Sequence, residues 1–222
     1  MNRSLVNGHL VCLAAAGLLV TASTVVQAEG TGFDDVATGE SPPGWTVTST
    51  GPGNPKWTVV PDASAPSRPN AFEQSGVADF PVAVKDDSKI ADGFVEVKFK
   101  PISGKEDQAG GVVWRYLDAN NYYICRANAL ENNVVLYRVY KGKRKSISPV
   151  GRLFAYGVEQ PVPAGQWHTL RAEFQGKRAK VLFNGKALFQ IEDKTFSGPG
   201  KVGVWTKADS VTRFDDFAYG SR

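Results

Sequence analysis

Apolar and polar residues alternate with a period of two along most of the chain after residue 28, and Gly, Asn, Asp and Pro stand between the alternating runs. Such alternation predicts β-strands that bury one face, because successive side chains of a strand point to opposite sides. Almost no window shows helical periodicity. We expect strands near residues 45–49, 57–60, 71–74, 78–84, 93–101, 111–117, 122–127, 134–140, 167–174, 178–183, 187–191, 200–207 and 213–219. So many strands imply two packed sheets and an all-β fold.

One hairpin is predicted at Asn184-Gly185, which lies between the runs K-V-L-F and K-A-L-F-Q-I. Both residues accept the positive φ angles that a two-residue turn requires. The turn would pair Phe183 with Lys186, Leu182 with Ala187, and Val181 with Leu188.

Three strand-forming runs and two short polar turns make up residues 110–141, which read G-G-V-V-W-R-Y-L-D-A-N-N-Y-Y-I-C-R-A-N-A-L-E-N-N-V-V-L-Y-R-V-Y-K. We expect an antiparallel meander with a two-residue turn at 119–120 and a three-residue turn at 130–132. This register predicts a basic, aromatic platform whose candidate ligand-binding residues are Arg115, Tyr122, Arg126, Asn128, Arg138 and Tyr140. The core would then take Val112, Trp114, Tyr123, Cys125, Val135, Tyr137 and Val139. A slip of one residue at the second turn would send Arg138 to the opposite face.

The first 28 residues have the pattern of a secretory signal: a basic start, an apolar run at 10–20, and small residues up to Ala28. We expect cleavage near Ala28, a secreted or periplasmic protein, and a single domain over residues 29–222. The alternative is an uncleaved N-terminal anchor. The apolar run is short for a spanning helix, which needs about 20 residues, and we expect no membrane span in the mature chain.

Charge and cysteine content restrict the function classes further. The formal net charge is +4, and loss of the signal removes one arginine and no acid. This is too mild for a nucleic-acid partner and is compatible with a neutral or an acidic saccharide. Cys125 is the only cysteine after residue 28, so the mature chain has no internal disulfide. Its strand position predicts a buried, unreactive thiol.

Segments between about residues 93 and 220 resemble the concanavalin A-like lectin/glucanase superfamily, most closely its laminin G-like and keto-disaccharide hydrolase-like branches. The resemblance rests on A-G-G-V-V-W-R-Y-L-D-A-N-N-Y-Y-I-C-R, on W-H-T-L-R followed by F-Q-G-K-R-A-K-V-L-F-N-G-K, and on G-K-V-G-V-W-T-K-A-D-S-V-T-R-F-D-D-F. It implies a jelly-roll of two curved antiparallel sheets that holds saccharide on the concave one, with Arg115 on that surface. Lectins, binding modules, glycosidases and lyases share this scaffold, so the resemblance implies the fold more than the activity.

A glucanase of this superfamily would show carboxylates at E-x-D-x-x-E spacing on one strand, and this sequence has none. Glu96 is the only acid in the body of its strand, and we expect it to be solvated or salt-bridged. His168, the only histidine after the signal, is expected to be packed and hydrogen-bonded. The basic run at 141–145 is expected to be a solvated turn, with contact to an acidic polymer as the alternative.

Paired carboxylates stand near both ends of the mature chain, in Phe33-Asp34-Asp35 and in Phe214-Asp215-Asp216. Strand pairing between the termini would explain the echo, although Asp is also common at turns. If the termini meet, Asp34, Asp35, Asp215 and Asp216 offer the hard oxygen ligands of a structural calcium.

The leading hypothesis is a carbohydrate-binding domain. Sugars stack on exposed aromatic rings, and a guanidinium grips a carboxylate or sulfate through two hydrogen bonds, so an acidic polysaccharide is a candidate partner. The arginines have a plainer interpretation as solvent-facing strand residues. A glycoside hydrolase or polysaccharide lyase at the same surface is the first alternative, with an arginine neutralising a uronate and Tyr122 or Tyr140 handling the proton. A laminin G-like protein-interaction module is the second.

Overall fold

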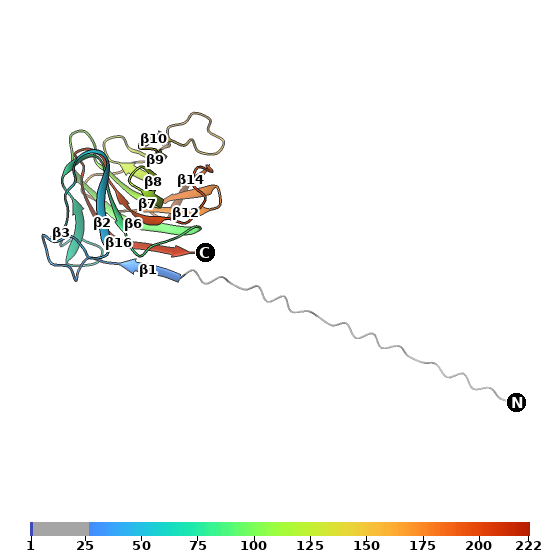
Figure 1. The fold of residues 1–222 in the computed structure, drawn as a ribbon, viewed down its shortest axis with the longest axis horizontal. Helices are drawn as coiled ribbons and strands as arrows, with labels where there is room; N and C mark the ends of the chain where they lie inside the picture. Colours follow the sequence, from blue (N-terminus) through green and yellow to red (C-terminus); the bar gives the residue numbers. More distant parts are fainter. Residues whose placement is uncertain (2–26) are drawn as a thin grey trace.

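The computed structural model describes Met1 and residues 27–222, so most of the predicted signal segment lies outside the described residues. Two antiparallel eight-stranded sheets pack face to face (Figure 1). No described residue is helical, and none forms a helix capable of crossing a membrane. The predicted two-sheet all-β fold is confirmed.

The first sheet runs in the order β14 (Lys186–Glu192), β13 (Arg178–Phe183), β12 (His168–Gln175), β6 (Gly93–Ser103), β16 (Val211–Ser221), β4 (Asn70–Gln74) and β3 (Trp57–Pro61), and β1 (Gln27–Thr31) pairs with β16. The second runs β10 (Lys143–Ser146), β9 (Asn133–Tyr140), β8 (Asn121–Asn128), β7 (Ala109–Asp118), β15 (Lys201–Trp205), β5 (Val77–Lys85) and β2 (Trp45–Asn54), and β11 (Val158–Glu159) pairs with β9. Every predicted strand is present, whereas β1, β10 and β11 were not predicted.

The two ends of residues 27–222 meet, which is one of the two arrangements that the sequence left open. Strand β1 pairs with the end of β16, with Glu29 opposite Tyr219 and Thr31 opposite Phe217. The Tyr219 hydroxyl donates to Glu29 Oε2 at 2.6 Å.

The main core lies between the sheets and is rich in aromatic rings. Phe72 contacts Phe33, Trp45 and Trp57, with ring centroids 5.2, 5.6 and 5.0 Å away. Cys125 is fully buried in this core, and burial raises the pKa of its thiol, which keeps it protonated and unreactive. His168 is packed as expected, because its Nε2 lies 2.9 Å from the Pro163 carbonyl oxygen and its ring stacks on a phenylalanine.

The Asn184-Gly185 hairpin forms with φ angles of 48° and 76°. Phe183 pairs with Lys186 and Leu182 with Ala187, as predicted. A bulge then places Val181 opposite Phe189, so the predicted pair of Val181 with Leu188 is wrong.

A second apolar cluster covers the outer face of the second sheet, which points away from the first sheet. The second sheet curls strongly, so this outer face is concave. Thr50 on β2 lies 2.7 Å from the hydroxyl of Tyr122 on β8, although three strands separate β2 from β8 in the sheet. Likewise Arg144 on β10 lies over Phe80 on β5. The concave face of the second sheet is therefore largely filled by the protein's own side chains.

The meander adopts a different register from the predicted one. Asp118 pairs with Asn121 around the predicted two-residue turn, but a bulge after Trp114 displaces Arg115 from the ladder. Residues 129–132 form the second loop, one residue more than predicted, and Tyr123 consequently faces Arg138. The slip moves Arg138 and Tyr140 to the face that looks towards the first sheet. It also moves three residues of the predicted core to the concave face: Val135, Tyr137 and Val139.

Candidate functional site

The predicted ligand-binding residues do not form one exposed platform. Tyr122, Arg126 and Asn128 belong to the concave side of the second sheet, where all three are buried. Arg138 and Tyr140 face the other side, and the bulge removes Arg115 from both sets. The prediction of one shared platform is therefore wrong, because the bulge at Arg115 and the longer loop at 129–132 place its residues on different faces.

Arg115 ties two loops to the sheet. Its guanidinium donates to the Ala91 carbonyl oxygen from Nε and Nη2, at 3.1 and 3.0 Å, and to the Phe196 carbonyl oxygen at 2.6 Å. Asp92 accepts a further bond from Nη2 at 3.0 Å. Only 2% of the side chain is exposed. The expectation that Arg115 lies open on the concave surface is therefore wrong.

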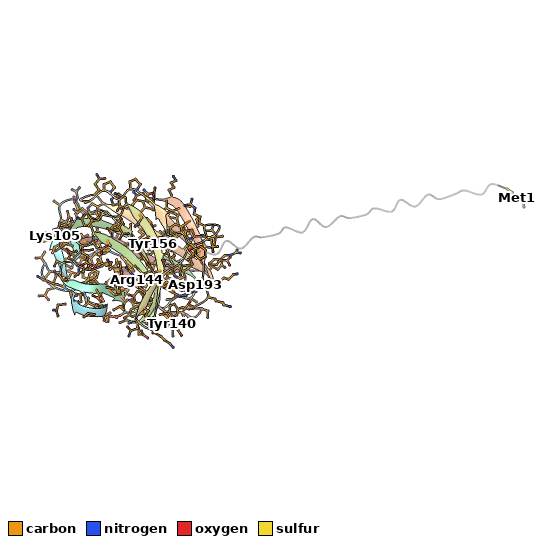
Figure 2. The ribbon with its side chains drawn as sticks, turned by 90° about the horizontal axis from the view of Figure 1, so that it is seen from above. Met1, Lys105, Tyr140, Arg144, Tyr156 and Asp193 are labelled. Carbon is orange, nitrogen blue, oxygen red and sulfur yellow. The ribbon has the colours of Figure 1, made fainter. Side chains whose placement is uncertain are left out.

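Arg138 and Tyr140 line a separate polar cleft with Lys177, Asp193 and Thr195. Arg138 pairs with Asp193 Oδ2 at 2.5 Å, and Asp193 also accepts the Tyr123 hydroxyl at 2.6 Å. Burial favours a raised pKa for Asp193, but the hydrogen bonds that it accepts outweigh burial and lower the pKa. Tyr140 is about half exposed, and in the view from above it is labelled at the lower edge of the molecule with Asp193 above it (Figure 2).

Arg144 reaches across the concave face from the edge strand β10. Its guanidinium carbon lies 4.5 Å from the ring centroid of Tyr137, 4.6 Å from that of Phe80 and 5.6 Å from that of Trp205. Sequence reasoning assigned residues 141–145 to a solvated turn and missed this arginine. The alternation within K-R-K was the available signal, since it puts Arg144 on the opposite face from its two lysine neighbours.

Arg126 lies beside this arginine and holds three hydroxyl or carboxylate groups. Its Nη2 donates to Glu131 Oε2 at 2.8 Å, to the Tyr137 hydroxyl at 3.1 Å and to the Tyr156 hydroxyl at 3.3 Å. Nη1 donates to the side-chain oxygen of Asn133. Burial raises the pKa of the Tyr137 hydroxyl, which therefore stays protonated and serves as donor and acceptor.

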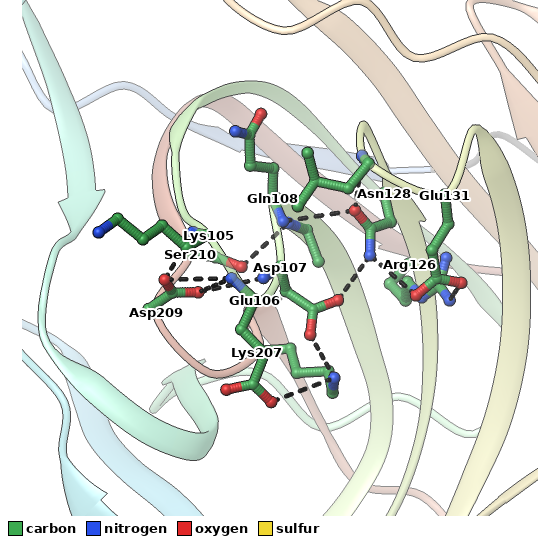
Figure 3. Close-up of polar contacts among 12 residues, drawn as sticks. Lys105, Glu106, Asp107, Gln108, Arg126, Asn128, Glu131, Lys207, Asp209 and Ser210 are labelled. Carbon is green, nitrogen blue, oxygen red and sulfur yellow. Dashed lines mark hydrogen bonds and ion pairs between the residues drawn. The ribbon is translucent and has the colours of Figure 1, made fainter.

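A buried polar hub adjoins Arg126, where loops at one end of the second sheet converge (Figure 3). The Asn128 amide donates to Asp107 Oδ1 at 2.6 Å and to Glu131 Oε1 at 3.0 Å, and Asp107 pairs with Lys207. Burial favours a raised pKa for Glu131, but the Arg126 charge and the hydrogen bonds that Glu131 accepts lower it, so the group is ionised at neutral pH.

Asp209 fixes the loop that carries Asp107 by accepting backbone N–H bonds from Lys105, Glu106 and Asp107 at 2.6, 3.0 and 3.1 Å. These bonds outweigh the effect of burial and lower the pKa of Asp209.

We call the end of the concave face bounded by Phe80, Arg126, Arg144, Tyr156 and Lys207 the concave mouth. Phe80 and Lys207 also line a surface hollow with Asp79 and Glu106. Tyr156 is about half exposed, whereas Arg126 is almost fully covered.

Two buried polar atoms of the concave mouth have no hydrogen-bond partner within the described part of the protein: Arg126 Nε and Arg144 Nη1. A buried donor or acceptor left unpaired costs about 1–3 kcal/mol, so a water or ligand group that reaches these atoms would recover part of that cost. Cations, hydroxyls and aromatic rings together can bind a polar molecule that also has apolar faces.

The carboxylates predicted to bind calcium have protein partners. Asp215 accepts the Ser67 hydroxyl at 2.7 Å and the Ser67 amide at 2.8 Å, and Lys98 pairs with Asp216 at 2.7 Å. Asp34 Oδ1 accepts a hydrogen bond from the backbone N–H of Asn70 at 3.0 Å. No cluster of acidic, histidine or cysteine side chains suited to a metal occurs in the described residues. These contacts use oxygens that calcium would need, so the residues fit the ion poorly and calcium stays a prediction.

No protein-family model and no curated protein matches the sequence, but solved structures match the fold. A carbohydrate binding module, CBM66 from Bacillus subtilis, aligns with a TM-score of 0.61 at 19% identity, covering 80% of this chain and 94% of that one. The cellulose induced protein Cip1 aligns at 0.59 with 12% identity, covering 84% and 95%. A lichenase, a β-1,3-1,4-glucanase derived from a mouse hindgut metagenome, aligns at 0.55 with 12% identity, covering 87% and 98%. The protein has a concanavalin A-like jelly-roll fold, as its sequence predicts.

Proposed function

We propose that the protein binds carbohydrate at the concave mouth and works outside the cytoplasm, in the periplasm or secreted. The observation that carries the proposal is the pairing of unpartnered donors on Arg126 and Arg144 with the rings of Phe80 and Tyr156. Sugars present hydroxyls at their edges and C–H groups on their faces, which match these two kinds of group. The fold shared with a carbohydrate binding module and a glucanase supports the same class of ligand.

The charge at the mouth favours an acidic saccharide. Arg144 has no carboxylate partner among the described residues, while its three neighbouring rings are neutral. A uronate or sulfate would place its charge beside this guanidinium in a partly desolvated setting, where ion pairing is stronger than at the open surface.

Calorimetric titration with neutral and uronate-containing oligosaccharides tests the proposal. Arg144→Leu keeps the apolar stem over the rings and removes the charge, and we expect it to weaken binding at least about tenfold, since a charge-assisted bond is worth about 1.5–3 kcal/mol. Arg138→Leu is the matched control, because Arg138 lies in the separate polar cleft. Loss of binding in the control alone would place the ligand there, and no binding by the folded wild type would refute the proposal.

Glycoside hydrolysis is the second candidate, favoured by the spacing of two carboxylates. Asp107 and Glu131 bond to the same Asn128 amide nitrogen at 2.6 and 3.0 Å, which brings them close to the separation of about 5–5.5 Å found in retaining glycosidases. The lowered pKa of Glu131 and the ion pair of Asp107 with Lys207 both disfavour a general acid here. A reducing-end assay on bound oligosaccharides separates the candidates, because release abolished by Glu131→Gln would establish the hydrolase.

A further inference from the structure

Residues 147–157 join β10 to β11, and together with β10 and the turn before it (141–146) they form a cationic segment with an exposed apolar tip, which we call the basic loop. Its sequence, K-G-K-R-K-S-I-S-P-V-G-R-L-F-A-Y-G, contains basic residues and no acid. Leu153 and Phe154 are 82% and 89% exposed, and Val150 is 61% exposed. They are more exposed than the other large apolar side chains of residues 27–222 except Val77, at 64%. Apolar residues gathered at one exposed point mark an interaction surface.

The backbone holds the apolar tip outwards. The Ala155 amide donates to the Arg152 carbonyl oxygen at 3.1 Å, so Leu153 and Phe154 are the two central residues of a turn. Phe154 has a φ of 62°, a left-handed value that favours glycine and is unfavourable for a bulky residue. A turn selected only to connect two strands would place glycine here, and a phenylalanine indicates that the exposed ring has a use.

Both sides of the tip are tied to the sandwich. The Val150 amide donates to the Gln190 carbonyl oxygen on β14 at 2.8 Å, and the Tyr156 hydroxyl accepts a bond from Arg126. The loop projects beyond the strands at the upper right of Figure 1. The tip therefore projects from the protein surface, and its two ends are held to the sandwich.

Three lysines lie on β10 and in the turn before it, and Arg152 directly precedes the apolar tip. Lys141, Lys143, Lys145 and Arg152 are exposed, and none takes part in a salt bridge with any residue in the described part of the chain. Most of the remaining arginines do: Arg115, Arg126, Arg138, Arg171, Arg178 and Arg213. The loop thus carries a local positive charge that the protein does not neutralise.

We propose that the basic loop docks the protein on an anionic lipid surface, with Leu153 and Phe154 entering the boundary between headgroups and acyl chains. Apolar tips surrounded by lysine and arginine suit that boundary, where acyl chains take the apolar groups and acidic headgroups attract the cations. A glycan would stack on the Phe154 ring but offers nothing to Leu153 or Val150. A second copy of the chain would bring the same positive charge and repel it. The proposal does not depend on the glycan site.

Co-sedimentation of the purified protein with vesicles tests the proposal. We expect binding to phosphatidylcholine vesicles that contain phosphatidylglycerol, weak binding to phosphatidylcholine alone, and weakening by salt, since exposed charges are screened. Leu153→Ser/Phe154→Ser should lower binding by about tenfold or more, because each buried apolar side chain favours transfer from water. Lys143→Glu/Lys145→Glu should lower it by a similar factor.

Matched controls separate the loop from general surface effects. Val47→Ser removes an exposed apolar side chain elsewhere, and Lys89→Glu/Lys105→Glu makes the same charge change away from the loop. Both should stay within about twofold of wild type, since surface changes away from such a contact have small effects.

Equal binding to both vesicle types, or equal losses in loop and control variants, would overturn the proposal. A soluble acidic polysaccharide provides a further test. If it displaces the wild type and Leu153→Ser/Phe154→Ser from the vesicles equally, the loop recognises charge alone, and the proposed insertion of the apolar tip is wrong. Leu153→Ser/Phe154→Ser should keep the oligosaccharide affinity of the wild type, because neither residue belongs to the concave mouth, so failure of the glycan site and failure of the loop are distinguishable.

Discussion

Replacing Arg115 with alanine should destabilise the fold and leave carbohydrate binding by the folded fraction unchanged. The guanidinium supplies bonds to the carbonyl oxygens of Ala91 and Phe196 and is 2% exposed. Each charge-assisted bond is worth about 1.5–3 kcal/mol, and the substitution leaves the Phe196 carbonyl oxygen buried without a donor. The pair with Asp92, a carboxylate that is 38% exposed, adds at most about 1 kcal/mol. We expect a loss of about 3–5 kcal/mol in the free energy of unfolding.

Urea unfolding followed by tryptophan fluorescence measures this loss, because the buried Trp114 directly precedes Arg115. Arg115→Lys keeps the charge but not the planar fork that reaches two carbonyl groups, so it should recover only part of the stability. Arg178→Ala is the control, since its side chain is 70% exposed and its ion pair is worth about 1 kcal/mol at most. A loss below about 1 kcal/mol in Arg115→Ala, accompanied by lost glycan binding, would refute the structural role and restore the predicted ligand contact.

Further predictions concern packing, acid stability and thiol chemistry. Gly203→Ala should cost about 2 kcal/mol in urea unfolding, because its Cβ would lie 2.1 Å from a carbonyl oxygen of β5, whereas Gly198→Ala, with nothing within 4 Å, should cost under about 0.5 kcal/mol. Burial favours a raised pKa for Asp62, but hydrogen bonds led by that from Lys100 outweigh it and hold the pKa well below its usual range. The unfolded chain therefore takes up the proton first, so the Asp62 contribution is complete above about pH 4 and is lost as the pH falls below that. Asp62→Asn should flatten the acid limb of unfolding free energy against pH; an unchanged limb would contradict the assignment. Cys125 should react with an aromatic disulfide reagent only at the rate of unfolding, and fast reaction in native buffer would show that the core is open there.

The strand pattern of this protein was readable from its sequence, because alternation and turn residues act locally. Every predicted strand is present, the Asn184-Gly185 turn forms with both positive φ angles, and His168 and Cys125 are packed as expected. Pairing of the chain ends was one of two explanations for the echo of the Phe33 and Phe214 segments. The ends do pair, but through residues 27–31 and 217–221, and the carboxylates of the echoing segments bond to protein groups.

The register of the meander was not readable, because the sequence pattern loses its information where both faces of a strand are buried. Val134, Val135 and Leu136 are all fully buried, so sliding β9 by one residue exchanges one apolar set for another at no visible cost in the pattern. The length of the loop at 129–132 and the bulge at Arg115 settle the register. Both depend on distant partners, because the loop bonds to Gln108 and Gln160 and Arg115 bonds to Ala91 and Phe196.

The candidate site was half readable for a related reason. Arg126 lies at the concave mouth and Asn128 in the adjoining polar hub, whereas Arg144 and Phe80 come together only because the second sheet curls until β10 faces β5. Sequence alone thus determined the elements, the two-sheet fold and the residue types available for recognition. Tertiary structure decided which arginines support the fold and which line the concave mouth, because that choice depends on contacts between strands far apart in the chain.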